Sequence, residues 1–323
     1  MKLKKYNRYP QLLLFAFGIL LAGIFLAGAL FCWQLERVAE QERQGLTAWE
    51  AQKAAIDGIR KLGGKVMVDK TRPGLPVISA RLYSNSPITA DGLTHLQAFP
   101  ELLEACIFHE NYSGAGLVHL NGMKKLQILH LGYNIADDNL VHLHAFPKLR
   151  ELYISSRAMT DKGMAHIKGL TTLEGFHVNN AKITDNGLVH VQGFINLREL
   201  SLAGPHINVN GAGLKYLKGL KKLEVIHIRA NISGESLVNL IGLNRLHNVS
   251  IISPNLSNDG LKHLQQLAGL QELDLSNCQI DDDGLKSLHG LFELRKLNVQ
   301  NTKVTEHGTN LIRKKLPNLE LMW

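Results

Sequence analysis

The stretch from Leu270 to Glu293 reads LQELDLSNCQIDDDGLKSLHGLFE. It opens with apolar residues two apart, at Leu273 and Leu275, which is the spacing of a β-strand with one buried face. Further along, Leu285 and Leu288 lie three apart, as they would on one face of a helix. The pattern therefore predicts one short strand and one helical turn within a single short unit.

This unit recurs from about residue 75 onward. When the copies are aligned on the residue that follows a glycine in nearly every one, the interval between successive copies is almost constant. A Ser, Thr, Asp or Asn stands four positions earlier in most copies, where it can cap a helix. Such regularity indicates a solenoid, in which each repeat buries its apolar residues only against its neighbours. The aligned residues are Leu93, Leu117, Leu140, Met164, Leu188, Leu214, Leu237, Leu261, Leu285 and Thr309.

One interval, from Leu188 to Leu214, is longer than all the others. The extra residues fall near Ala203, just after the expected strand of that copy. We therefore expect a bulged loop at this point of the array.

The pattern LxxLxLxxN/C/T-xxIT-DxGLxxL resembles the leucine-rich repeat, in the 24-residue, cysteine-containing-like form with ITDxGL that is abundant in planctomycetes. Residues 54–64 are similar to the lead-in before such arrays, and Leu316 with Pro317 to a truncated last unit. The resemblance implies an α/β solenoid of about ten repeats over residues 75–323, with parallel strands on the concave side and helices on the convex side. The N/C/T position departs from the type at Arg157, Ala181, Pro205 and Pro254.

The N-terminal region predicts a membrane anchor. Residues 11–33 carry no charge, and as a helix they are long enough for the ~30 Å hydrocarbon core. Residues 1–10 hold four cations, whereas the charges after the span are mixed. The positive-inside rule then predicts a cytoplasmic basic tail at 1–10, a single transmembrane helix (signal anchor) at 11–33, and a periplasmic or extracellular repeat domain. A cleaved signal peptide, with Ala27–Ala29 at the cleavage site, is the alternative.

Residues 34–74 are predicted to link the span to the repeats. They read as a juxtamembrane helix ending at Gly63 and Gly64, a short strand at 65–69 and a loop. Trp49 and Ile59 fall on one apolar face of this helix, which predicts an N-terminal cap on the array. A solvated stalk is the alternative.

Charge and cysteine content exclude several classes of function. The net charge is +8, but four of the cations precede the span, so the remaining chain is nearly balanced and gives no reason to expect nucleic acid. Three cysteines provide no disulfide framework, and Cys278 reads as a buried structural thiol. The chain has no P-loop, GxSxG, HExxH or CxxC motif. We therefore expect no enzymatic activity, no catalytic residue and no cofactor.

Histidines are numerous, 15 in all, and six of them share one position on the convex side. A shared transition metal is conceivable along such a column, but no acidic residue shares it to orient the imidazoles. We therefore expect no metal site, and interpret the column as a half-exposed position copied with the repeat. Its members are His95, His119, His142, His166, His190 and His263.

The concave face is the candidate binding surface. Residues between the paired strand positions should point outward; they are His130, Tyr153, His177, Ser201, His227, Ser250, Asp274, Asn298 and Glu320, with Asn179 and Arg229 two positions further along two strands. A rigid surface of Tyr, His and Arg is typical of protein-binding patches, although a merely solvated sheet face is equally compatible. The predicted protein-binding residues are His130, Tyr153, His177, Asn179, His227, Arg229 and Asp274.

The sequence thus predicts a non-catalytic, membrane-anchored leucine-rich-repeat protein that mediates protein–protein interaction outside the cytoplasmic membrane. The alternatives are a structural envelope protein that self-associates, or a ubiquitin-ligase-type substrate adaptor, since cysteine-containing repeats occur beside F-boxes. A hydrophobic N-terminus in place of an F-box argues against the adaptor.

Overall fold

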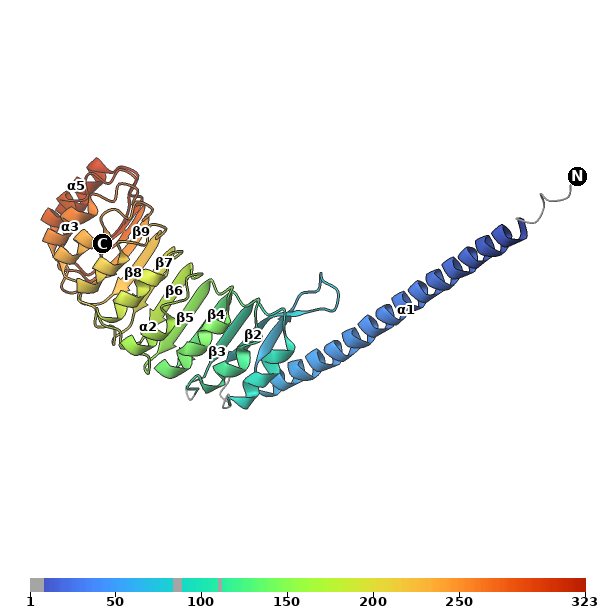
Figure 1. The fold of residues 1–323 in the computed structure, drawn as a ribbon. Helices are drawn as coiled ribbons and strands as arrows, with labels where there is room; N and C mark the ends of the chain where they lie inside the picture. The colour runs from blue at the N-terminus through green and yellow to red at the C-terminus, as the bar shows by residue number, and fades with distance from the viewer. Residues whose placement is uncertain (1–8, 84–88, 110–111) are drawn as a thin grey trace, which may run out of the picture. The chain divides into compact units, whose positions relative to one another are not determined.

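The computed structural model describes the backbone of residues 9–83, 89–109 and 112–323, and within it the side chains except those of residues 9–29, 31, 32 and 42. The chain divides into two compact units, 1–54 and 55–323. The first unit is part of one long helix, α1 (Tyr9–Lys61), whose last turns belong to the second unit. Figure 1 shows the course of the chain by residue number.

The segment expected to cross a membrane, 11–33, falls mostly on residues whose side chains lie outside this description. Within the part of the chain that the structure describes, no helix combines the length and apolar character that a membrane span needs. Trp49, predicted to lie on a buried face, is 45% exposed.

The second unit is built on a single sheet whose strands follow the order of the sequence. Its strands β2 to β12 pair in parallel, one from each repeat, as the period-two pattern predicts. The strands are β1 (Lys65–Val68), β2 (Val77–Tyr83), β3 (Glu104–Phe108), β4 (Ile128–Tyr133), β5 (Glu151–Ser156), β6 (Gly175–Asn179), β7 (Glu199–Ala203), β8 (Val225–Arg229), β9 (Asn248–Ile252), β10 (Glu272–Asp274), β11 (Lys296–Asn298) and β12 (Glu320–Met322).

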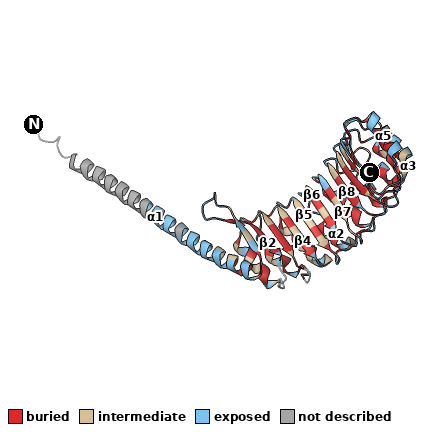
Figure 2. Cartoon of the chain, turned by 180° about the vertical axis from the view of Figure 1, so that it is seen from behind, coloured by how far each residue is buried: buried red, intermediate tan, exposed pale blue. Residues whose placement is uncertain are grey.

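A helical segment follows each strand from β2 to β11 and packs against the helical segments of the adjacent repeats. Most are 3₁₀ segments, because the tighter helix is common where the chain makes only one or two turns between connections. They are η1 (Asp91–Ala98), η2 (Ala115–Leu120), η3 (Asp137–Ala145), α2 (Asp161–Ile167), η4 (Gly187–Gly193), η5 (Ala212–Leu217), η6 (Gly234–Leu240), α3 (Asn258–Leu264), α4 (Asp282–Lys286) and α5 (Glu306–Lys315). The array curves with its strands on the inner side (Figures 1 and 2).

The core lies between the strands and the helical turns and continues from repeat to repeat, as the red interior of Figure 2 shows. Both members of each predicted strand pair are buried, for example Leu273 and Leu275. Each such side chain contributes roughly 1.5–3 kcal/mol when fully removed from water. Cys278 is also buried, and its thiol donates to the carbonyl of Ile251 at 3.1 Å, which agrees with a structural role.

The end of α1 and strand β1 begin the array within the second unit. Ala55 and Ile59 are buried, and Gly63 closes the helix with a φ of +73°. Strand β1 pairs antiparallel with β2, unlike the other strands. The first rung is therefore covered on its outer side by a helix end and a reversed strand.

Acidic residues in the first helical turns join neighbouring repeats. The Asp161 carboxylate accepts hydrogen bonds from the backbone amide of Thr184, at 2.9 Å, and from its hydroxyl, at 2.6 Å. Asp137 and Asp282 bind the equivalent threonines one repeat later, Thr160 and Thr305. The helix dipole therefore explains only part of why these positions are acidic, since each carboxylate also links two repeats.

Candidate functional site

The strand register brings one residue from each repeat into a row on the exposed side of the sheet, which we call the central ladder. This row lies on the concave face, between the buried members of each strand pair. In order from β2 to β12 it comprises Arg81, Cys106, His130, Tyr153, His177, Ser201, His227, Ser250, Asp274, Asn298 and Met322.

Three rings of the central ladder form a continuous stack. His130 and Tyr153 lie with centroids 4.2 Å apart and planes inclined by 7°. Tyr153 and His177 repeat the arrangement at 4.1 Å and 4°. Parallel strands stand about 4.8 Å apart, so rings that project from adjacent strands meet at stacking distance without distortion. The sheet thus holds the three rings in one orientation before any ligand arrives.

Two further aromatic residues continue this surface toward the N-terminal end of the array. Tyr83 and Phe108 stack with ring centroids 5.4 Å apart, and the ring centroids of Phe108 and His130 lie 6.3 Å apart. Phe108 covers Gly132, where a Cβ would lie 2.3 Å from its ring. Tyr83 itself is 53% exposed. We call Tyr83, Phe108, His130, Tyr153 and His177 the aromatic strip.

Two carboxylates flank the end of the strip at His177. Glu151 Oε2 lies 3.8 Å from His177 Nε2, and Glu199 Oε1 lies 3.8 Å from His177 Nδ1. The Tyr153 hydroxyl donates to Glu151 at 3.4 Å. Burial, together with the charges of Glu151 and Glu199, raises the pKa of Tyr153. His177 Nε2 is buried and makes no hydrogen bond within the described residues, which is rare for a buried polar atom.

A hollow of about 310 Å³ opens over the strip. Five of the seven residues that the sequence predicted to bind protein line this hollow, namely His130, Tyr153, His177, Asn179 and His227. Burial lowers the pKa of both His130 and His227, so both rings are neutral near pH 7. His227 Nδ1 lies 2.8 Å from the Ser250 hydroxyl, which fixes its ring. These two residues therefore add no positive charge to the hollow near pH 7.

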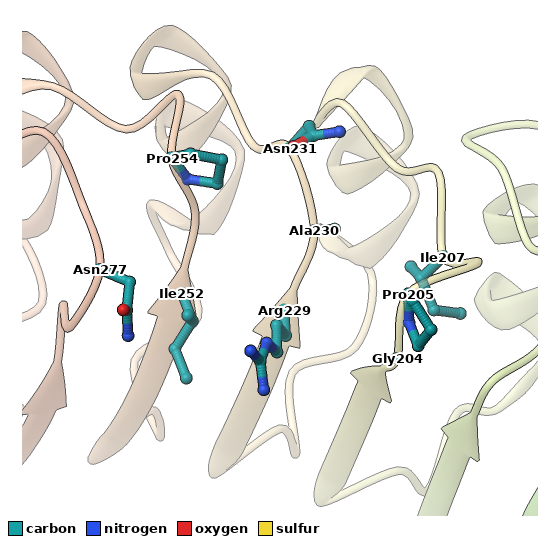
Figure 3. Close-up of a pocket in the computed structure, with 9 residues that line it drawn as sticks. All are labelled: Gly204, Pro205, Ile207, Arg229, Ala230, Asn231, Ile252, Pro254 and Asn277. Atoms are coloured by element: carbon teal, nitrogen blue, oxygen red, sulfur yellow. The ribbon is translucent and has the colours of Figure 1, made fainter.

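Arg229 lines a separate hollow of about 480 Å³ at the carboxyl ends of β7 to β9. Figure 3 shows Arg229 and Ile252 on adjacent strands, with Pro205 and Pro254 on the loops beyond them. The longest interval between repeats falls here, and its extra residues form the loop after Ala203. Asp274 lines neither hollow: its carboxylate accepts from the Ser276 amide at 2.9 Å.

Sequence reasoning missed the start of the central ladder and mispredicted its end. Counting back one repeat from His130 gives Cys106, and the register adds Arg81 before it. Glu320 was predicted in the last position, but it pairs with Lys296 and the ladder residue is Met322. Thr309 stands thirteen positions before Met322, the same offset as from Leu285 to Asn298, so the constant spacing of the repeats already pointed to Met322.

The histidines of the convex column have individual surroundings in the described part of the chain. The ring of His95 lies against Gly58, where a Cβ would be 2.5 Å from it. His166 lies 3.8 Å from the carboxylate of Asp138. Across the described residues, one group of three potential metal ligands comes together, and no member of the convex column belongs to it.

These features define an α/β solenoid with one strand per repeat and an aromatic strip on the strand side. A family profile described as "Leucine Rich repeat" matches residues 270–288, which supports the interpretation of the repeated unit as a leucine-rich repeat. Comparison with curated proteins finds no match.

Among solved structures, the chain is similar to an internalin of Listeria monocytogenes, with 19% identity over 71% of this chain and 69% of that chain, and a TM-score of 0.53. A second internalin of the same bacterium, internalin C2, shares 17% identity over 74% of this chain and 87% of that chain, with a TM-score of 0.43. At such identities the likeness concerns the fold alone.

Proposed function

We propose that this protein binds a protein partner through its concave face, with the aromatic strip as the centre of the contact. The observation that carries the proposal is the stack of His130, Tyr153 and His177 at the floor of the 310 Å³ hollow. Half-exposed aromatic side chains in a fixed orientation lose little entropy on binding, and such residues dominate interface energetics.

The surroundings of the strip suggest what the partner offers. Glu151 and Glu199 provide negative charge beside His177, and Asn179 provides an amide in the same hollow. Arg229 in the second hollow provides a cation further along the sheet. A partner segment with an apolar or aromatic anchor and a basic group would satisfy the first hollow. An acidic group one or two strands further along would satisfy Arg229.

A pull-down with the full chain tests this proposal. Tyr153→Ala combined with His177→Ala should abolish partner recovery while the circular dichroism spectrum stays unchanged. Phe292→Ala with His307→Ala is the matched control, since both residues are exposed and lie outside the strand face. Equal recovery by the two double variants would overturn the proposal.

We further propose that residues 11–33 anchor the protein in a membrane, with the N-terminus in the cytoplasm and the repeats in the periplasm or outside the cell. The support comes from the sequence: an uncharged apolar segment of membrane length, four cations before it and mixed charges after it. The planctomycete-type resemblance of the repeats agrees with a bacterial envelope. Protease protection of an N-terminal tag in intact cells tests the orientation; a digestible tag would reverse it.

Self-association is the second candidate function. Met322 and Trp323, on and beside the last strand, are 42% and 52% exposed. Apolar side chains at the end of a solenoid can pack against another copy. Sedimentation velocity over a range of concentrations tests this candidate: a growing oligomer supports it, and a strict monomer excludes it.

A further inference from the structure

The concave face holds one group of potential metal ligands, which includes His130 of the aromatic strip. Glu104 and Cys106 project from β3, and His130 projects from β4 beside them. The carboxylate, thiol and imidazole ligand atoms all lie within 4.8 Å of one another. The Cys106 thiol already contacts Glu104 Oε1 at 3.3 Å.

This group belongs to a pattern that returns every second repeat. A glutamate on one strand lies diagonally opposite a histidine on the next: Glu104 with His130, Glu151 with His177, and Glu199 with His227. At the second of these pairs the diagonal brings carboxylate and imidazole to 3.8 Å. The ladder residue between glutamate and histidine differs in each case, and it is Cys106, Tyr153 and Ser201 respectively.

Only the first of the three groups therefore contains a soft sulfur ligand. Cysteine, histidine and glutamate together are a donor set that Zn²⁺ accepts in tetrahedral sites. Around zinc the donor atoms would stand about 3.5 Å apart, given bond lengths of about 2.0–2.3 Å. The ligand atoms already lie within 4.8 Å of one another, so they need to approach by about 1.3 Å at most, which side-chain rotation can supply.

The neighbours of the group are suited to hold the ligands. The Arg81 guanidinium donates to Glu104 Oε1 from Nε at 3.2 Å and from Nη2 at 3.0 Å. Ligating carboxylates are commonly held by such outer hydrogen bonds. The imidazole of His130 is fixed by its stack on Tyr153.

We propose that Glu104, Cys106 and His130 form a zinc site with three protein ligands and a fourth position open to the concave face. On coordination the Cys106 thiol loses its proton to solvent, and the resulting thiolate binds the metal. His130 also lines the hollow, so the open position adjoins the surface proposed to bind protein. The site stands on its own geometry and does not depend on that proposal.

Cobalt provides the test, because thiolate-bound Co²⁺ gives a charge-transfer absorption that oxygen and nitrogen ligands alone do not. The background is the full chain with Cys32→Ser and Cys278→Ser, which leaves Cys106 as its only cysteine. After removal of any histidine tag and of bound metal, Co²⁺ should produce this absorption at one equivalent, and Zn²⁺ should abolish it. No absorption, or one that survives Cys106→Ser, would overturn the proposal.

The repeated pattern supplies matched controls. Glu104→Gln should weaken Co²⁺ binding at least roughly tenfold, the scale on which disturbing a metal site acts, whereas Glu151→Gln should leave it unchanged. His130→Gln should likewise weaken Co²⁺ binding, and His177→Gln should leave it unchanged. Equal effects of the two members of either pair would contradict the assignment.

A second measurement needs no ligand variant. In the same background, saturating Zn²⁺ should slow alkylation of the Cys106 thiol at least roughly tenfold relative to Mg²⁺, because a metal-bound thiolate is no longer free to react. An unchanged alkylation rate under zinc would overturn the site even if every ligand variant failed to fold.

Discussion

The rings of Tyr153 and His177 stack across β5 and β6 with centroids 4.1 Å apart and planes within 4° of parallel. Neither residue is near the other in sequence, and neither belongs to the buried core. Their contact exists because the sheet places the two strands in register. It holds the two rings in one fixed orientation on the concave face.

This stack should be measurable as a coupling. In a double-mutant cycle, Tyr153→Ala and His177→Ala should show an interaction of about 0.5–1.5 kcal/mol in the free energy of unfolding, the usual range for aromatic pairs. Urea unfolding followed by circular dichroism measures it. The pair Tyr153→Ala and His227→Ala should show none, because β8 lies three strands from β5. Equal coupling in both cycles would contradict the stack.

The link between Asp161 and Thr184 should carry stability between repeats. Asp161→Ala leaves the Thr184 amide and hydroxyl without their acceptor and should lower the free energy of unfolding by about 1–3 kcal/mol. Asp259→Ala is the control, because Asp259 lies in the equivalent first turn of α3 but is exposed. It should change stability by less than about 0.5 kcal/mol. A comparable loss of unfolding free energy in both variants would show that Asp161 acts only through its charge near the helix dipole.

The same carboxylate explains why a glycine follows it one repeat later. A Cβ on Gly187 would lie 2.3 Å from Asp161 Oδ1. We therefore expect Gly187→Ala to destabilise the fold by about 1–3 kcal/mol, the range for overpacking. In the Asp161→Ala background the same substitution should cost less.

Gly219→Ala is the comparison for Gly187→Ala, because a Cβ there meets nothing within 4 Å. It should be neutral or slightly stabilising, since alanine has fewer unfolded conformations to lose. Thermal unfolding of Gly187→Ala, of Gly187→Ala combined with Asp161→Ala, and of Gly219→Ala measures the difference in stability. Loss of stability at Gly219 of the same size would show that backbone freedom, rather than the carboxylate, selects glycine.

Stability should fall as the pH drops below about 6.5, because burial lowers the pKa of His130 and His227 in the folded state. The unfolded chain then binds more protons than the folded one, and linkage makes the free energy of unfolding rise with pH in this window. The loss begins near the ordinary histidine pKa and is complete below the lowered values. Carboxylate titration intervenes only at lower pH.

The contribution of one histidine can be isolated. His227→Gln should show a shallower decline in unfolding free energy between about pH 7 and pH 5.5 than the parent protein. Exposed His307→Gln should keep the parent slope. Identical slopes for parent and His227→Gln would show that His227 titrates alike in both states.

Much of the fold could be predicted from the repeat unit. The apolar spacing located the strands, and each predicted strand pair is buried. The repeat glycines were recognised as positions, but the reason for their pairing with the first-turn aspartates was not. That reason, a carboxylate filling the space that a Cβ at Gly187 or Gly308 would occupy, involves two repeats at once.

The candidate site was predicted only in part, because its contacts also join different repeats. The outward direction of His130, Tyr153 and His177 follows from strand alternation, which is local. Arg229 lines a separate hollow, and Met322 rather than Glu320 pairs with Asn298. These neighbours are set by the register of adjacent strands, which alternation within one strand does not reveal.

For this protein the sequence by itself determined the period, the strand positions and the buried residues, because these depend on hydrophobic spacing within one repeat. Only the tertiary structure decided that Tyr153 stacks on His177, that Asp161 binds Thr184, and that Cys106 meets Glu104 and His130. These contacts join different repeats, and their geometry is set by the register of adjacent strands about 4.8 Å apart.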